Sequence, residues 1–137
     1  MVDHYLAEYG TYHTDRRNLI CHEIGIPLIV LSIFALLELV RFGPIDLAMV
    51  AGVAVISFYL TLDLKLGLVA LVAFALLYVI GRFVWWPVAI ALFVVGWIFQ
   101  FVGHHHEGRS PAFLTNLVHL LVGPLWIVSL AVRRTKT

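Results

Sequence analysis

The chain has 137 residues, of which 62% are hydrophobic and only 12% are charged. A soluble domain is about 45 to 50% apolar and about 25% charged, so both fractions favour a membrane protein. The formal net charge is +1 and the nine Lys and Arg residues form no long basic stripe, which argues against a nucleic-acid partner. The single cysteine, Cys21, excludes an intramolecular disulfide.

Before the first apolar run, aromatic and apolar residues recur at offsets of three and four from residue 2 to residue 13. This spacing predicts an amphipathic helix that lies in the membrane interface. The same segment is too polar to be the core of a secretory signal peptide, which needs about 7 to 15 consecutive apolar residues. We therefore expect the first membrane span to direct its own insertion.

Long apolar runs then predict an all-α, polytopic membrane helix bundle with about five transmembrane helices, because a span needs about 17 to 25 residues. Turn residues such as Gly43-Pro44 and Gly81-Arg82 separate the runs. The predicted spans are residues 24–42, 45–62, 66–80, 85–102 and 113–132, of which the third is the shortest. No repeat or linker is present, so residues 1–137 are expected to form one integral membrane domain.

Alternating spans gather the histidines at one side of the membrane. Four crossings return the chain to the side of its N-terminus, so residues before the first span and after the fourth share that side. Six of the seven histidines fall in these two segments, namely His4, His13, His22, His104, His105 and His106. His119 lies nine residues beyond Ser110, a helical distance of roughly 13 Å from the same side.

Two groups of polar residues share a helix face at this side. Gln100, His104 and Glu107 follow one another at offsets of four and three, and Asn18 lies four residues before His22. Histidine with a carboxylate oxygen suits non-haem Fe(II), although zinc accepts similar ligands. The candidate metal ligands are His13, His22, His104 and Glu107, with His106 and His119 in reserve.

Other polar residues receive structural interpretations. An isolated interfacial histidine is more often a solvated or hydrogen-bonded residue than a ligand, so no role is assigned to His4 or His105. Glu38, Arg41 and Asp46 lie close in sequence around the first predicted hairpin and are expected to form an interfacial ion-pair cluster.

The chain resembles a family of membrane 2-hydroxy fatty acid dioxygenases, in particular its short bacterial members. The first matching block comprises Tyr12-His13, Asn18, His22, Gly25 and Pro27. The second comprises Gln100-Phe101-Val102-Gly103-His104, Glu107, Pro111-Ala112 and the later string Gly123-Pro124-Leu125-Trp126. The resemblance implies an Fe(II)-dependent oxidoreductase of fatty acid α-oxidation, as in phytosphingosine degradation, that uses molecular oxygen to shorten a 2-hydroxy fatty acid by one carbon.

Site roles follow from this hypothesis. The catalytic candidates are Glu107, Gln100 and Asn18, and the candidates for pairing with the substrate carboxylate are Arg16, Arg17 and Arg109. The fatty acid tail would partition into the bilayer while its head group remains at the interface. The expected partners are therefore the membrane and a lipid or fatty acid substrate, and the sequence indicates no oligomeric state.

Two alternative functions stay open. A zinc-dependent membrane lipid hydrolase would use the same ligands, with Glu107 as the base for a metal-bound water. A non-enzymatic transport or scaffold protein would use its histidines for packing, but the chain lacks an ionisable path through the membrane centre. The expected location is a bacterial inner membrane with the site on the cytoplasmic side, or the endoplasmic reticulum in a eukaryote; the distribution of basic residues decides no orientation.

Overall fold

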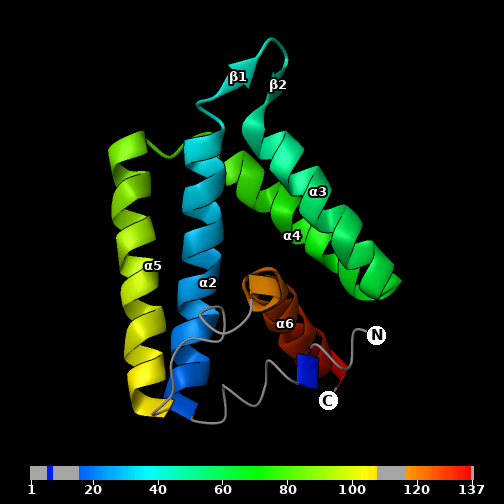
Figure 1. The fold of residues 1–137 in the computed structure, drawn as a ribbon, viewed down its shortest axis with the longest axis vertical. Coiled ribbons are helices and arrows are strands. Elements are labelled where there is room, and N and C mark those ends of the chain that lie inside the picture. The colour runs from blue at the N-terminus through cyan, green and yellow to red at the C-terminus, as the bar shows by residue number, and fades with distance from the viewer. Residues whose placement is uncertain (1–5, 8–15, 108–116, 137) are drawn as a thin grey trace.

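A computed structural model describes residues 6–7, 16–107 and 117–136 of the chain. Figure 1 shows long helices joined by short turns, which confirms the predicted all-α fold class. In chain order the elements are α2 (Arg16–Leu37), β1 (Arg41–Phe42), β2 (Ile45–Asp46), α3 (Leu47–Leu62), α4 (Leu64–Gly81), α5 (Trp86–Glu107) and α6 (Leu117–Lys136).

Helix α2 differs from the first predicted span at both ends. It begins at Arg16 instead of residue 24, because the polar residues that precede the apolar run continue the same helix. It ends at Leu37 instead of residue 42, and the backbone then tightens into turns in which the N–H of Val40 donates to the carbonyl of Leu37 at 3.1 Å. The apolar run therefore located this helix but not its boundaries.

A short β-hairpin, which the sequence interpretation did not include, follows α2. Strands β1 and β2 pair antiparallel, with Phe42 opposite Ile45. All four strand residues had been assigned to the predicted membrane spans 24–42 and 45–62. The predicted turn at Gly43-Pro44 is confirmed as the hairpin loop. Gly43 has a φ of 71°, a conformation that glycine adopts without steric cost.

Two aspartates set the boundaries of the next helices. The side chain of Asp46 accepts a hydrogen bond from the N–H of Met49, and that of Asp63 accepts one from the N–H of Leu66, each at 2.9 Å. The break between α3 and α4 is therefore the single residue Asp63, and α4 is longer than the predicted span 66–80. The shortest apolar helix of the first four is α3, with 16 residues, and not α4 as predicted.

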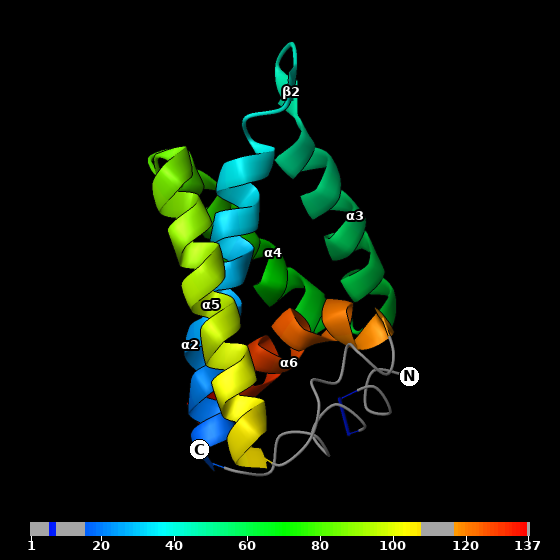
Figure 2. The ribbon, with the colours of Figure 1, turned by 60° about the vertical axis from the view of Figure 1, so that its left-hand side comes forward.

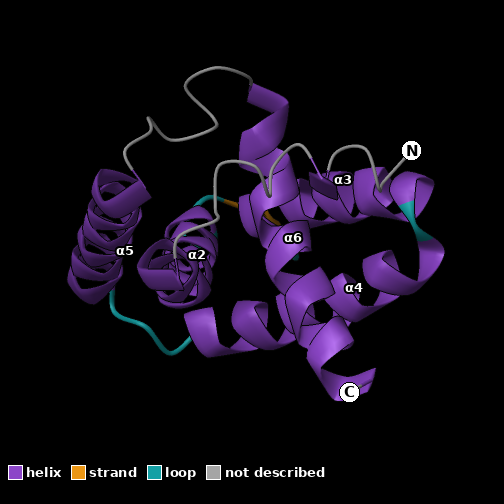
Figure 3. Ribbon diagram, turned by 90° about the horizontal axis from the view of Figure 1, so that it is seen from below, coloured by secondary structure: helices purple, strands orange, loops and turns teal. Residues whose placement is uncertain are grey.

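Helices α2 to α5 alternate in direction, as predicted. The start of α2 and the end of α5 consequently lie at the same end of the bundle, the lower end in Figure 1. Helix α5 continues to Glu107 rather than ending at residue 102, which keeps Gln100 and His104 on one uninterrupted helix. Figures 2 and 3 show α6 running across this lower end instead of alongside α2 and α5.

Three of the described helices are long and apolar enough to cross a membrane. Their apolar segments are Leu19–Leu37, Leu64–Gly81 and Trp86–Gly103. Two shorter apolar helices cover Leu47–Leu62 and Val122–Val132, so the number of five spans remains a prediction. Of the predicted N-terminal amphipathic helix, Leu6 and Ala7 are described and helical, whereas its other positions lie outside the described residues.

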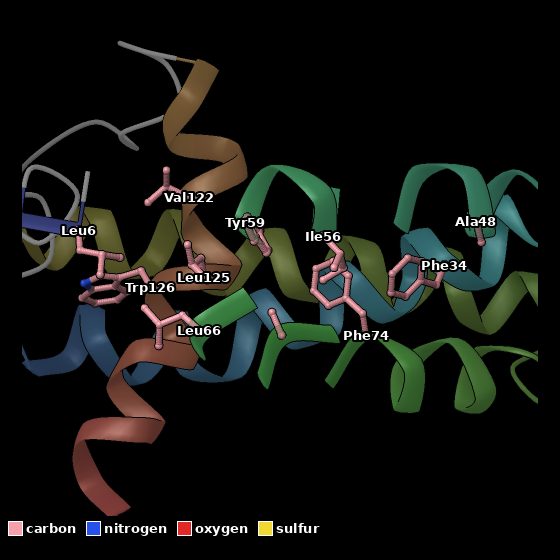
Figure 4. Close-up of a cluster of buried hydrophobic side chains, with 11 residues drawn as sticks. Leu6, Phe34, Ala48, Ile56, Tyr59, Leu66, Phe74, Val122, Leu125 and Trp126 are labelled. Atoms are coloured by element: carbon pink, nitrogen blue, oxygen red, sulfur yellow. The ribbon is translucent and has the colours of Figure 1, made fainter. Parts of the chain in front are cut away.

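The main hydrophobic core joins α2, α3, α4 and α6 (Figure 4). Its aromatic centre is Phe74, whose ring packs edge-on against Phe34 at a centroid distance of 5.3 Å and against Tyr59 at 6.0 Å. Leu125 and Trp126 extend the core to α6. This contact holds α6 against the lower part of the bundle.

The polar cluster predicted from Glu38, Arg41 and Asp46 lies at the opposite end of the bundle from His22. Asp46 is fully buried, accepts a hydrogen bond from the hydroxyl of Tyr78 and lies 3.9 Å from the guanidinium of Arg41. Glu38 is 7% exposed, and burial, together with the charge of Asp46, raises its pKa to about 7 against the opposing effect of Arg82 and Arg41.

This pKa predicts a pH-dependent stability. Because the folded pKa of Glu38 lies above the ordinary 4.5, the folded state holds the proton more tightly, and stability should fall as pH rises from about 4.5 through 7. We expect Glu38→Gln to remove this decline, measured as melting temperature in detergent between pH 4.5 and pH 8. Glu23→Gln, on helix α2, is the control; equal slopes for wild type and Glu38→Gln would contradict the assignment.

Candidate functional site

His22 is the best-defined chemical group at the lower end of the bundle. It lies on α2 and is only 1% exposed, which makes it one of the most deeply buried large side chains in the described part of the chain. Its ring meets that of Trp126 from α6 edge-on, with centroids 6.5 Å apart and an angle of 90° between the planes. Because α6 crosses this end of the bundle, its Trp126 can cover the ring of His22.

Helix α5 brings a second buried polar group to the same region. The amide of Gln100 is 5% exposed, and its Nε2 has no hydrogen-bond partner among the described residues. A Cβ added to Gly25 would overlap this Nε2, so the amide lies directly against the backbone of α2. Gly25 follows His22 by three residues, which places the amide about one helical turn from the histidine along α2.

The two helices approach closely because both carry glycine where they cross. A Cβ on Gly25 would lie 2.9 Å from the carbonyl oxygen of Gly96, and a Cβ on Gly96 would lie 3.0 Å from that of Gly25. Such distances are too short for any larger residue unless a backbone moves. Gly25 and Gly96 therefore permit close packing of α2 against α5, and the crossing fixes α5 relative to His22.

The other predicted site residues are placed to different degrees. Arg16 and Arg17, at the start of α2, and His105, near the end of α5, are exposed. Five candidates occupy helical positions, but their side chains lie outside the described part: Asn18, His104, His106, Glu107 and His119. His13 and Arg109 lie outside the described residues altogether.

The described side chains test a metal site only in part. Among residues 6–7, 16–107 and 117–136, no three His, Cys, Asp or Glu side chains lie close enough together to hold a metal ion. Of the predicted ligands, His22 is the one whose side chain is described. A buried imidazole on α2, at the end of the bundle where the α5 backbone carries His104, fits a ligand set drawn from two helices.

The contribution of Trp126 to this region was not predicted as a contact. The sequence placed it in the string Gly123-Pro124-Leu125-Trp126 near the middle of a last span, far from the histidine side. In the structure it is 5% exposed and packs on His22. The resemblance of that string to a family motif was the available signal, but hydropathy alone gave no reason to pair it with α2.

These features define a class of protein: a helical bundle with membrane-spanning character and a buried histidine and amide at one end. Comparison with known proteins makes the class specific. The chain belongs to the 2-hydroxy-palmitic acid dioxygenase Mpo1-like family, whose profile matches residues 1–135. This confirms the predicted family of dioxygenase enzymes.

A similar curated protein is the 2-hydroxy-palmitic acid dioxygenase MPO1 of Saccharomyces cerevisiae. It is 39% identical over 123 residues, which cover 85% of this chain and 71% of the yeast protein. No solved structure matches the chain.

Proposed function

We propose that the protein is an Fe(II)-dependent dioxygenase that shortens 2-hydroxy fatty acids by one carbon at a membrane interface. The observation that carries the proposal is the family match over residues 1–135, to which the yeast 2-hydroxy-palmitic acid dioxygenase adds the substrate class. The buried His22 and Gln100 supply polar chemistry at the lower end of a mainly apolar bundle. Such groups at membrane depth are costly and indicate a functional site.

His22, His13 and His104 would hold the iron, with Glu107 as a further oxygen ligand. When bound, iron would supply the activation of molecular oxygen. The overall reaction consumes one O2 for each 2-hydroxy acid, cleaves the bond between C1 and C2, and leaves the shortened acid with carbon dioxide and water. In this proposal His22 is kept away from bulk water by α6, since Trp126 packs on its ring.

The same geometry suits a substrate that is part head group and part acyl chain. Arg16 and Arg17 are exposed at the start of α2, six and five residues before His22, roughly 8 to 9 Å along the helix. Their guanidinium groups would pair with the carboxylate at the interface, as would Arg109. The tail would extend beside the apolar surfaces of the bundle, so the membrane serves as the substrate reservoir.

Purified protein in detergent tests the proposal. We expect about one iron per chain and loss of 2-hydroxypalmitate that consumes an equal amount of oxygen and stops under anaerobic conditions. Removal of iron by a chelator should abolish turnover, and Fe(II), but not Zn(II), should restore it. Oxygen-independent loss of substrate with bound zinc would instead indicate the hydrolase, and a metal-free inactive protein the transport or scaffold function.

Location follows from the same proposal. The apolar helices support a membrane location, which we propose to be the inner membrane of a bacterium with the site on the cytoplasmic side, or the endoplasmic reticulum of a eukaryote. Labelling of a cysteine introduced at the exposed position His105 by a membrane-impermeant reagent, in intact compared with opened cells or vesicles, tests which compartment faces the site.

A further inference from the structure

The amide of Gln100 is an unusual group for the contact between α2 and α5. Two buried side-chain polar atoms in the described part of the chain have no hydrogen-bond partner, Oε1 of Glu38 and Nε2 of Gln100. Glu38 lies at the far end of the bundle among charged groups, whereas Gln100 lies beside Gly25, one turn from His22. The Gln100 donor is therefore the one that belongs to the candidate site.

Packing alone does not account for this residue. A buried amide donor without an acceptor carries a desolvation cost that an apolar side chain of similar size avoids. Leucine or methionine would fill the same space between the helices. The Gly25 and Gly96 crossing also leaves the amide little freedom to turn away, because α2 backbone lies directly against it. The structure thus holds a hydrogen-bonding group in a fixed place at a cost in stability.

The depth of Gln100 indicates which part of a substrate it would meet. Along α5 it precedes His104 by four residues, about 6 Å farther from the lower end of the bundle. The exposed Arg16 and Arg17 lie at that end, outside His22. A 2-hydroxy acid with its carboxylate at the arginines and its tail in the bilayer presents its C2 hydroxyl on the inner side of the carboxylate.

We propose that Gln100 is the residue that selects 2-hydroxy acids over plain fatty acids, by hydrogen bonding to the C2 hydroxyl. This inference rests on the proposed function and names the group that recognises its substrate. A neutral amide suits a hydroxyl because each can both donate and accept a hydrogen bond. A carboxylate, by contrast, is matched by the cationic guanidinium groups nearer the interface.

The test compares binding of 2-hydroxypalmitate and palmitate to protein in nanodiscs, without oxygen, after subtraction of binding to empty discs. Wild type is expected to prefer the 2-hydroxy acid. Gln100→Leu should bind 2-hydroxypalmitate about tenfold more weakly, the value of one net hydrogen bond, and bind palmitate as wild type does. Its melting temperature should equal or exceed that of wild type, because the unsatisfied donor is gone. Its iron content should match that of wild type, because Gln100 is not among the proposed iron ligands.

Matched variants separate the outcomes. Ser32→Ala is the control, because it removes a fully buried polar group on α2, the hydroxyl that donates to the carbonyl of Ile29 at 2.7 Å. It should leave the preference for the 2-hydroxy acid intact. If Gln100→Leu folds poorly, Gln100→Met provides the same test. Equal weakening of both acids, or a retained preference, overturns the inference while the proposed function stands. Absence of any preference in an iron-loaded wild type overturns both.

Discussion

Replacing His22 by glutamine is expected to lower turnover of 2-hydroxypalmitate at least about 100-fold and to reduce the iron retained after purification. Glutamine keeps much of the volume that packs against Trp126 but lacks the basic imidazole nitrogen. His22 is fully buried at the end of the bundle where the α5 backbone carries His104, so an exposed side chain at the surface cannot take over the role of its ring nitrogen. Iron per chain and oxygen consumption, measured on the same preparation, check the expectation.

A control for this experiment lies on α5. His105 is exposed and matches no ligand position, so His105→Gln should retain iron content and turnover within about twofold of wild type, as expected for a surface substitution. Comparison of the melting temperatures of the two variants separates loss of metal from loss of folding. Full iron content and full activity in His22→Gln would remove His22 from the ligand set and leave it as a packing residue against α6.

The sequence predicted the helical fold because apolar runs of near-membrane length have few other solutions. The alternation of the first four helices followed from the short turns at Gly43-Pro44 and Gly81-Arg82, and it placed His22 and the end of α5 on one side. Helix boundaries were less accessible. Helix α2 begins at Arg16, in the polar segment before the first apolar run. Hydropathy detects the apolar run and therefore cannot predict where the polar part of the helix begins.

The strand pairing of Phe42 with Ile45 was missed for a related reason. Both residues are apolar and were counted into spans, whereas the positive φ of Gly43 and the capping side chain of Asp46 decide the local backbone. Short-range hydrogen bonds of this kind override hydropathy at the ends of helices. The turn was predictable from its Gly-Pro sequence, but the strands around it were not.

The candidate site shows the same division. His22 and Gln100 were identified from spacing and family resemblance, and in the structure both side chains are buried toward the same end of the bundle. The packing of Trp126 on His22 depends on α6 crossing that end, which no periodicity along α6 specifies. Likewise, the contact between Gly25 and the Gln100 amide depends on how α2 and α5 cross, a property of two surfaces rather than of either sequence segment.

Gly96→Ala is expected to lower the free energy of unfolding by about 1 to 3 kcal/mol, the usual cost of overpacking a closely packed contact. The new Cβ would lie 2.6 Å from Cγ1 of Ile29 and 3.0 Å from the carbonyl oxygen of Gly25, so α2 and α5 must separate. Part of the loss is offset because alanine favours helix over glycine by about 1 kcal/mol. Thermal or denaturant unfolding in detergent measures the difference.

Gly52→Ala on α3 provides the matched comparison, because the same substitution there meets only the ring of Phe34 at 3.7 Å, an ordinary contact. It should be neutral or stabilising by up to about 1 kcal/mol, from helix propensity alone. Separation of α2 from α5 would also shift Gln100 relative to His22, so Gly96→Ala should lose activity even at temperatures where it stays folded. Equal stability of the two variants would show that the crossing tolerates a methyl group, and that the position of the Gln100 amide is not fixed by glycine contact.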